Sequence, residues 1–269
     1  MELEDYAIYL HLIENRKYSE AADFKNSKIP NSLFKYYSFD NNYPDLNNSK
    51  IEYLKAGKVY LSTLYPSPFN DPFEGNFLIF NEKELKRKKW DRNLIEKYYT
   101  SLVKKWYVSC LSNTNEQNMP MWAYYANNHN GFCVKYEFSD EQKKYIFPVS
   151  YEEKRQSANS IITRLLTSMY KLKANGKLSG EDRVLLQILF LSMTAKHISW
   201  SHEKEYRIIC NQAWFPALAK EIYIGINCEP TYANQILKIA DALNGYCKVY
   251  QMDICRDNSN FELQKEILV

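Results

Sequence analysis

Two glutamates that are two positions apart, Glu203 and Glu205, stand just before the apolar run 208–210. Side chains alternate along a strand, so both carboxylates and Arg207 are expected on one face. Repulsion between two such carboxylates raises one pKa unless a cation or a ligand hydroxyl lies between them. The pair is therefore a candidate for ligand binding or acid–base chemistry. The alternative is an edge strand whose charges are solvated.

A second polar motif, residues 70–74, follows a proline-rich stretch. Pro72 fixes its own backbone φ and favours an extended conformation for Asp71, and Asn70 or Asp71 can cap the turn that follows. In one interpretation Asp71 and Glu74 bind a metal or a substrate. In the other, the motif is a rigid structural turn whose two phenylalanines anchor the core.

Two histidines could add acid–base or metal-binding capacity. His129 lies in a polar turn, where its imidazole could act near neutral pH, and His202 immediately precedes the acidic pair. With Asp71, Glu74 and Glu205, either histidine could complete a carboxylate–histidine metal site of hydrolase type. No HxxxH or HxH spacing accompanies them.

The composition excludes several classes of protein. The 269-residue chain is 45% hydrophobic and has a net charge of only +3, so no strong overall field favours nucleic acid. Neither GxGxxG nor GxxxxGK[ST] occurs, and glycine is scarce, at 7 residues. The 23 tyrosines suit a cleft for a flat ligand, and they equally suit an ordinary core.

Three features of the sequence bear on where the protein is located: its cysteines, its N-terminal residues and its longest apolar stretch. None of the six cysteines forms a CxxC pair, so reduced thiols are expected. Residues 1–10 lack a signal-peptide pattern. The longest apolar stretch, 184–195, is interrupted by polar residues and is too short to span a bilayer. We therefore expect a cytoplasmic protein with no membrane partner.

The periodicity predicts an α+β fold, in which residues 1–30 are a helical lead-in and residues 31–269 form a single domain. Strands are predicted at 33–38, 58–63, 107–111, 132–138, 203–210, 221–226 and 246–252. Helices are predicted at 49–56, with Gly57 as C-cap, and at 82–105, 121–126 and 232–244, with two further amphipathic helices across 161–169 and 184–193.

Several motifs together resemble the bacterial domain-of-unknown-function family DUF2971. The resemblance spans about 33–263 and is carried by Leu33-Phe34-Lys35-Tyr36, Leu61-Ser62 and the segments 69–74, 121–125, 129–133, 200–207 and 222–225. Membership of this family implies no function.

The order of the motifs also resembles, more distantly, the ADP-ribosyltransferase fold. In that superfamily a first strand carries His or Arg, a second carries Tyr or Ser-Thr-Ser, and a late strand carries Glu, in one branch as Glu-x-Glu. The corresponding positions here are Lys35 or Tyr36, then Ser62 and Thr63, then Glu203 and Glu205. The chain departs from the pattern because lysine lacks the planar fork of arginine and because Leu64 replaces the third residue of Ser-Thr-Ser.

This second resemblance implies a twisted, split, mixed sheet with helical insertions and NAD as the substrate. Cleavage of the glycosidic bond of NAD passes through an oxocarbenium-like cation, which a carboxylate stabilises. Glu205 would bind the ribose and Glu203 would activate the acceptor. The expected ligand-binding residues are Lys35, Tyr36, Ser62, Thr63, Asn70, Asp71, Glu74, His129 and Arg207.

The function expected from these resemblances is an NAD-using enzyme like the ADP-ribosyltransferases. Such an enzyme transfers ADP-ribose to a macromolecular acceptor, protein or nucleic acid, or hydrolyses NAD, and a role in bacterial defence or toxicity would fit. Two alternatives stay open at this point: a metal-dependent hydrolase or nuclease built on Asp71, Glu74, Glu205 and a histidine, and a non-catalytic module that binds a nucleotide.

Overall fold

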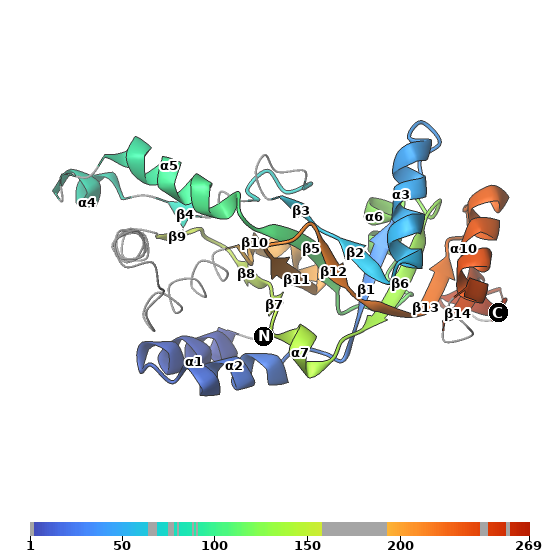
Figure 1. Cartoon of the computed structure of the whole chain (residues 1–269), viewed down its shortest axis with the longest axis horizontal. Coiled ribbons are helices and arrows are strands. Elements are labelled where there is room, and N and C mark those ends of the chain that lie inside the picture. Colours follow the sequence, from blue (N-terminus) through green and yellow to red (C-terminus); the bar gives the residue numbers. More distant parts are fainter. Residues whose placement is uncertain are drawn as a thin grey trace.

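A mixed β-sheet flanked by helices organises the computed structural model of the chain (Figure 1). The structure describes residues 3–63, 69–74, 78–79, 81–87, 89, 91–157, 193–242, 247–256 and 259–269. The amphipathic helices predicted across 161–169 and 184–193 lie outside the described residues, apart from Met193. The α+β prediction is confirmed.

The main sheet of the described residues has nine strands in the order β15-β14-β13-β6-β1-β5-β11-β7, with β3 also paired to β5. The parallel pair β13–β14 makes this sheet mixed. The strands are β1 (Ser32–Tyr37), β3 (Ser62–Thr63), β5 (Tyr107–Ser112), β6 (Phe132–Glu137), β7 (Ile146–Pro148), β11 (Glu205–Cys210), β13 (Leu218–Ile224), β14 (Lys248–Ile254) and β15 (Leu263–Ile267).

Shorter strand pairs form two-stranded sheets separate from the main sheet in the described residues. They are β2 (Lys58–Tyr60) with β12 (Trp214–Pro216), β8 (Ser150–Glu152) with β10 (Ala195–His197), and β4 (Leu78–Ile79) with β9 (Gln156–Ser157). The helices are α1 (Leu3–Glu14), α2 (Tyr18–Ser27), α3 (Pro44–Lys55), α4 (Glu82–Arg87), α5 (Arg92–Val103), α6 (Met119–Tyr125), α7 (Asp140–Lys143), α10 (Pro230–Ala242) and the 3₁₀-helix η1 (Ile198–Glu203). No described helix combines the length and apolar character that crossing a membrane needs.

The two faces of the sheet around β1 pack against different helices (Figure 1). On one face, Leu33 and the alternate residues of β6 and β13 form the main core with α3 and α10. On the other face, Tyr36 packs with Trp122 of α6. This division follows from the alternation of side chains along β1, which sends successive residues to opposite faces.

The observed bounds of β1 and α3 can be compared with the predicted ones. β1 occupies the predicted 33–38 segment, shifted by one residue. Gly57, with φ of +64°, follows the C-cap Ala56 as expected, but α3 begins at Pro44, five residues before the predicted start at 49. Ile51 and Leu54 of α3 are buried in the core.

Other predicted elements differ in the structure. The helix predicted at 82–105 is divided into α4 and α5, and Leu94, expected on its inner face, is 50% exposed. The strand predicted at 58–63 is interrupted at Leu61, because β2 pairs with β12 whereas β3 pairs with β5. β15 was not predicted, since only two of its five residues are apolar.

The start of the acidic strand also differs. Glu203 ends η1 rather than lying on a strand, and Lys204 has φ of +44°, so β11 begins only at Glu205. The alternation argument therefore holds for Glu205 and Arg207, whose side chains contact each other. It is wrong for Glu203, which reaches the same region from the 3₁₀-helix.

Candidate functional site

A gap in the sheet lies beside the central strand β5. One edge of β5 pairs with β11 along its whole length. On the opposite edge, β1 is in register with β5 at Phe34↔Ser112, and β3 is in register at Ser62↔Val108. Between these two points the edge of β5 borders a cavity. The sheet is nevertheless continuous, because β1 pairs with β5 at this one position.

The cavity has a volume of about 670 Å³ and is lined by residues of α3 on one side and of α6 on the other. Since α3 and α6 cover opposite faces of the sheet, the cavity extends through the gap from one face toward the other. Ligand-binding cavities in proteins commonly measure about 300–1,000 Å³. The space is therefore large enough for a nucleotide-sized ligand.

A lysine joins the two carboxylates at one end of the cavity. Lys196 of β10 donates to Glu203 Oε2 at 2.6 Å and to Glu205 Oε2 at 3.2 Å, and all three side chains are buried. Their backbone positions lie on three different elements, β10, η1 and β11. The cation that the sequence argument required between the two acids is thus Lys196.

The two carboxylates have opposite pKa shifts. Burial and then the negative charge of Glu205 raise the pKa of Glu203, which Lys196 only partly offsets. Burial would also raise the pKa of Glu205, but Arg207 and Lys196 outweigh it and lower that pKa to about 2. At neutral pH Glu205 is a fixed anion, while Glu203 is the more easily protonated group of the pair.

Arg207 supports Glu205 from behind. Its guanidinium is fully buried, donates to Glu205 Oε1 at 2.8 Å, and binds both oxygens of Glu74, at 2.5 and 2.9 Å. It also donates to the backbone oxygen of Met193 at 2.5 Å. Arg207 and Glu74 are not among the residues that line the cavity. The two residues were predicted to bind the ligand directly. In the structure Glu74 instead binds Arg207, and Arg207 holds Glu205 in place.

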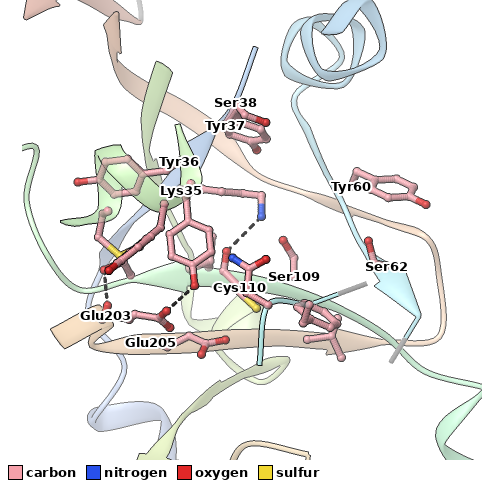
Figure 2. Close-up of a pocket in the computed structure, with 18 of the residues that line it drawn as sticks. Lys35, Tyr36, Tyr37, Ser38, Tyr60, Ser62, Ser109, Cys110, Glu203 and Glu205 are labelled. Atoms are coloured by element: carbon pink, nitrogen blue, oxygen red, sulfur yellow. Dashed lines mark hydrogen bonds between the residues drawn. The ribbon is translucent and has the colours of Figure 1, made fainter. Parts of the chain in front are cut away.

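Tyrosines surround the acidic end of the cavity. Tyr125 of α6 donates a hydrogen bond to Glu203 Oε1. The hydroxyl of Tyr151 accepts a hydrogen bond from the backbone nitrogen of Glu205 at 2.8 Å. Tyr36, which is nearly buried, packs edge-on against Trp122 and donates to the backbone oxygen of Asn115. Figure 2 shows Tyr36 and Glu203 on the same side of the cavity.

Lys35 bridges the gap itself. Its ammonium donates to the backbone oxygen of Cys110 on β5 at 3.1 Å and lies 5.4 Å from the ring centroid of Tyr37 (Figure 2). Burial lowers the pKa of Lys35, although Cys110 and Glu205 oppose the shift. An ammonium has three donors, and the carbonyl of Cys110 is the acceptor found for it within the described residues. Lys35 can therefore bind an anionic group inside the cavity.

The loop at 69–74 contributes to the wall of the cavity. Asn70 and Asp71 line it, and Asp71 accepts a hydrogen bond from the backbone nitrogen of Phe73 at 2.9 Å, as a capping aspartate would. Glu74 points instead to Arg207. Phe73 is 52% exposed, so the prediction that both phenylalanines anchor the core is wrong for Phe73.

Two other predicted residues lie elsewhere. The ring of His129 stacks on Trp122 at 5.6 Å and is not among the residues that line the cavity. Thr63 pairs with Tyr107 in the sheet, and of the two residues of β3 only Ser62 reaches the cavity. His129 is held in its turn by packing: the backbone of Gly225 approaches so closely that a Cβ there would lie 2.2 Å from the oxygen of His129.

The histidines do not join the acids. The exposed ring of His202 lies near those of Trp200 and Tyr124. In the part of the chain that the structure describes, no group of three or more His, Cys, Asp or Glu side chains is arranged to hold a metal ion. The four-residue constellation considered for a metal-dependent hydrolase is therefore not assembled among these residues.

Comparison with known proteins adds one finding. A family model described as a protein of unknown function, DUF2971, matches part of the chain. The match spans residues 121–208. This match confirms the DUF2971 resemblance over residues 121–208, a part of the 33–263 stretch in which the motifs were found. No curated protein and no solved structure matches the chain.

The DUF2971 match covers the acidic half of the cavity. It includes Tyr125, Lys196, Glu203, Glu205 and Arg207, whereas β1 and β3 precede it. Lys196 was missed at the sequence level because a single lysine in the stretch before η1 carries no motif. Tyr125 had a signal, since it ends the aromatic motif 121–125, but nothing in the sequence paired it with Glu203.

Proposed function

We propose that the protein is an NAD-using enzyme related in mechanism to the ADP-ribosyltransferases, which cleaves the bond between nicotinamide and ribose. The supporting observation is that Lys35 and Tyr36 of β1, Ser62 of β3, and Glu203 and Glu205 all line one cavity. These are five of the residues that the resemblance assigns to ligand binding and catalysis. They come from segments up to about 170 residues apart in the chain.

The permanent charge of Glu205 suits the reacting ribose. When the C–N bond breaks, its electron pair leaves with nicotinamide and positive charge develops on the ribose ring. A carboxylate whose pKa is about 2 stays ionised at neutral pH and stabilises this cation. Arg207 and Lys196 hold the carboxylate in one orientation, so it needs little reorganisation during the reaction.

Glu203 suits proton transfer to or from the acceptor. Its raised pKa makes it a stronger base than Glu205, and Tyr125 and Lys196 orient its two oxygens. In this scheme Glu203 accepts the proton of the attacking water or acceptor group as the new bond to ribose C1 forms. Lys35, beside the gap, binds the diphosphate.

The test is incubation of the purified chain with NAD, with chromatographic detection of released nicotinamide. Glu205→Gln should abolish the release, because the neutral amide cannot stabilise the ribosyl cation. Glu137→Gln is the matched control, since Glu137 is half-exposed, forms an ion pair with Lys220 and does not line the cavity. Full nicotinamide release by a folded Glu205→Gln protein would contradict the proposal.

The role of Glu203 can be tested separately with a cell extract as the source of acceptor. Glu203→Gln should reduce the transfer of ADP-ribose, seen as a mass increase on an extract component, more than it reduces the hydrolysis of NAD. The reason is that water can react with an oxocarbenium ion without strong base assistance. An equal loss of both activities would show that Glu203 does not act on the acceptor.

One observation favours a second candidate, a module that binds a nucleotide without turning it over. Both carboxylates are already paired with cations, Glu205 with Arg207 and Lys196, so the network could serve only to shape the cavity. Tight binding of NAD in calorimetry, with no nicotinamide released over a long incubation, would favour this candidate.

A further inference from the structure

The cavity continues well beyond the acidic end, along the side formed by α3 and β2. There it is lined by Lys50 and Tyr53 of α3 and by Tyr60 of β2. Figure 2 shows Tyr60 across the cavity from Glu203 and Tyr36, with Lys35 between them. A ligand that occupied only the acidic end would leave this second end empty.

The second end offers aromatic surface. The rings of Tyr53 and Tyr60 lie 5.4 Å apart, tilted by 54°, and Tyr60 is 50% exposed. A half-exposed tyrosine at the rim of a cavity presents a ring face on which a flat heterocycle can stack. Tyr36 provides the corresponding aromatic surface at the acidic end.

Two lysines line the cavity, Lys35 between its two ends (Figure 2) and Lys50 on the α3 side. Lys50 donates to the backbone oxygen and to the hydroxyl of Ser38, at 2.6 and 3.2 Å. Within the described residues these two acceptors leave one of its three donors available. Lys35 has donors available in the same way. The lining thus places the Lys35 cation between two aromatic ends (Figure 2), with Lys50 beside the second end, an order that matches base, diphosphate and base in a dinucleotide.

We propose that Tyr53, Tyr60 and Lys50 form the subsite for the adenosine half of the dinucleotide, on the α3 side of the sheet. The nicotinamide half then lies at Tyr36 and the carboxylates on the α6 side. This assignment rests on the proposed use of NAD and goes further, because it fixes the direction in which the dinucleotide passes through the gap.

The test compares the binding of NAD with that of nicotinamide mononucleotide, which lacks the adenosine half. The wild-type chain should bind NAD more tightly than the mononucleotide. Tyr60→Ala should weaken NAD binding by about tenfold, the usual effect of losing one stacking ring, and leave mononucleotide binding unchanged. Tyr60→Phe keeps the ring and should bind NAD like the wild type.

Tyr43→Ala is the matched control, because Tyr43 is exposed at the N-cap of α3 and does not line the cavity. Circular dichroism would establish that each variant is folded. The adenosine subsite would be overturned if Tyr60→Ala bound NAD and the mononucleotide equally more weakly than the wild type. It would also be overturned if the variant bound both ligands as tightly as the wild type. Equal affinity of the wild type for NAD and for the mononucleotide would do the same. If the wild type bound neither ligand, the proposed function would itself fail.

Discussion

At the scale of single residues, the arrangement around Glu205 depends on a guanidinium that does not line the cavity. Arg207 is shared between Glu205 and Glu74, and a further hydrogen bond ties it to the backbone of Met193. Two buried carboxylates so close together would repel each other strongly without it. Arg207 is therefore a positioning residue: it sets the orientation and the ionisation of Glu205.

Replacing Arg207 tests this role through stability. Arg207→Met should lower the free energy of unfolding by about 3–5 kcal/mol, because it leaves the buried Glu74 without its cation and the buried Glu205 with Lys196 alone. Urea denaturation measures the change. Arg92→Met is the control, since the ion pairs of Arg92 with Glu82 and Glu96 are exposed and its loss should leave the urea midpoint almost unchanged. Similar midpoints for the two variants would contradict the role of Arg207.

The low pKa of Glu205 predicts a pH dependence of stability. The folded-state pKa, about 2, lies below the ordinary value of 4.5. Stability from the ionised group is therefore fully present above pH 4.5 and is lost as the pH falls toward 2. The difference in unfolding free energy between the wild type and Glu205→Gln should shrink over that interval. A difference that stayed constant from pH 5 to pH 2.5 would count against the assigned ionisation.

At the scale of elements, the cavity exists because two strands share one edge of β5 without filling it. β1 meets that edge near Ser112 and β3 meets it near Val108. The helices α3 and α6 then close the gap from opposite faces. The position of the ligand site is thus a property of strand pairing, and Lys35 is the side chain that crosses the gap.

Lys35→Met should weaken the binding of NAD roughly tenfold or more, since charge-assisted hydrogen bonds contribute about 1.5–3 kcal/mol. Free nicotinamide, which has no phosphate, should bind the variant as it binds the wild type. Isothermal titration calorimetry with both ligands measures this. A parallel loss of nicotinamide binding would mean that the substitution had distorted the cavity rather than removed a phosphate contact.

The glycine at the start of β6 sets how closely β1 can approach the preceding turn. A Cβ at Gly131 would lie 1.8 Å from the backbone oxygen of Tyr37, whereas a Cβ at Gly57 would meet nothing within 4 Å. Gly57→Ala should cost about 1–2 kcal/mol through its left-handed φ alone. Gly131→Ala should cost more, because the backbone of β1 must move. Equal thermal shifts for the two variants would contradict this difference.

At the scale of the whole molecule, the N-terminal helices contact the far part of the sheet rather than trailing from it (Figure 1). Tyr6 of α1 donates to the backbone oxygen of Pro148 at 2.6 Å. Lys25 of α2 is buried, donates to the backbone oxygens of Lys143 and Ile146 at 2.7 and 2.8 Å, and lies over the ring of Phe147. Residues on the two sides of the predicted boundary at residue 30 are therefore in direct contact.

Lys25→Met should detach these helices. The variant loses the donor for two buried carbonyls, which costs about 1–3 kcal/mol for each group left unsatisfied. Faster limited proteolysis between residues 3 and 31, together with a lower urea midpoint, would be the expected result. Lys17→Met removes an exposed pair with Glu20 and should change neither measurement. Unchanged proteolysis in Lys25→Met would show that other contacts hold the helices.

Local patterns in the sequence were sufficient to predict several elements. The run of apolar and aromatic residues in β1 and Gly57 at the end of α3 are signals that lie in or beside the elements themselves. The acidic motif and the aromatic motif 121–125 also indicated a site, because their residue types stand out locally. Such signals need no knowledge of the rest of the chain.

Only the tertiary structure decided how those residues combine. Glu74 and Arg207 meet across 133 positions, and Tyr125 and Glu203 across 78. No periodicity reports such pairings, because they depend on the order of strands in the sheet. The chain by itself therefore determined which side chains are capable of chemistry. The pairing of β1, β3 and β11 around β5 decided which of them share a cavity, because electrostatic and hydrogen-bonding forces act over distances in space rather than in sequence.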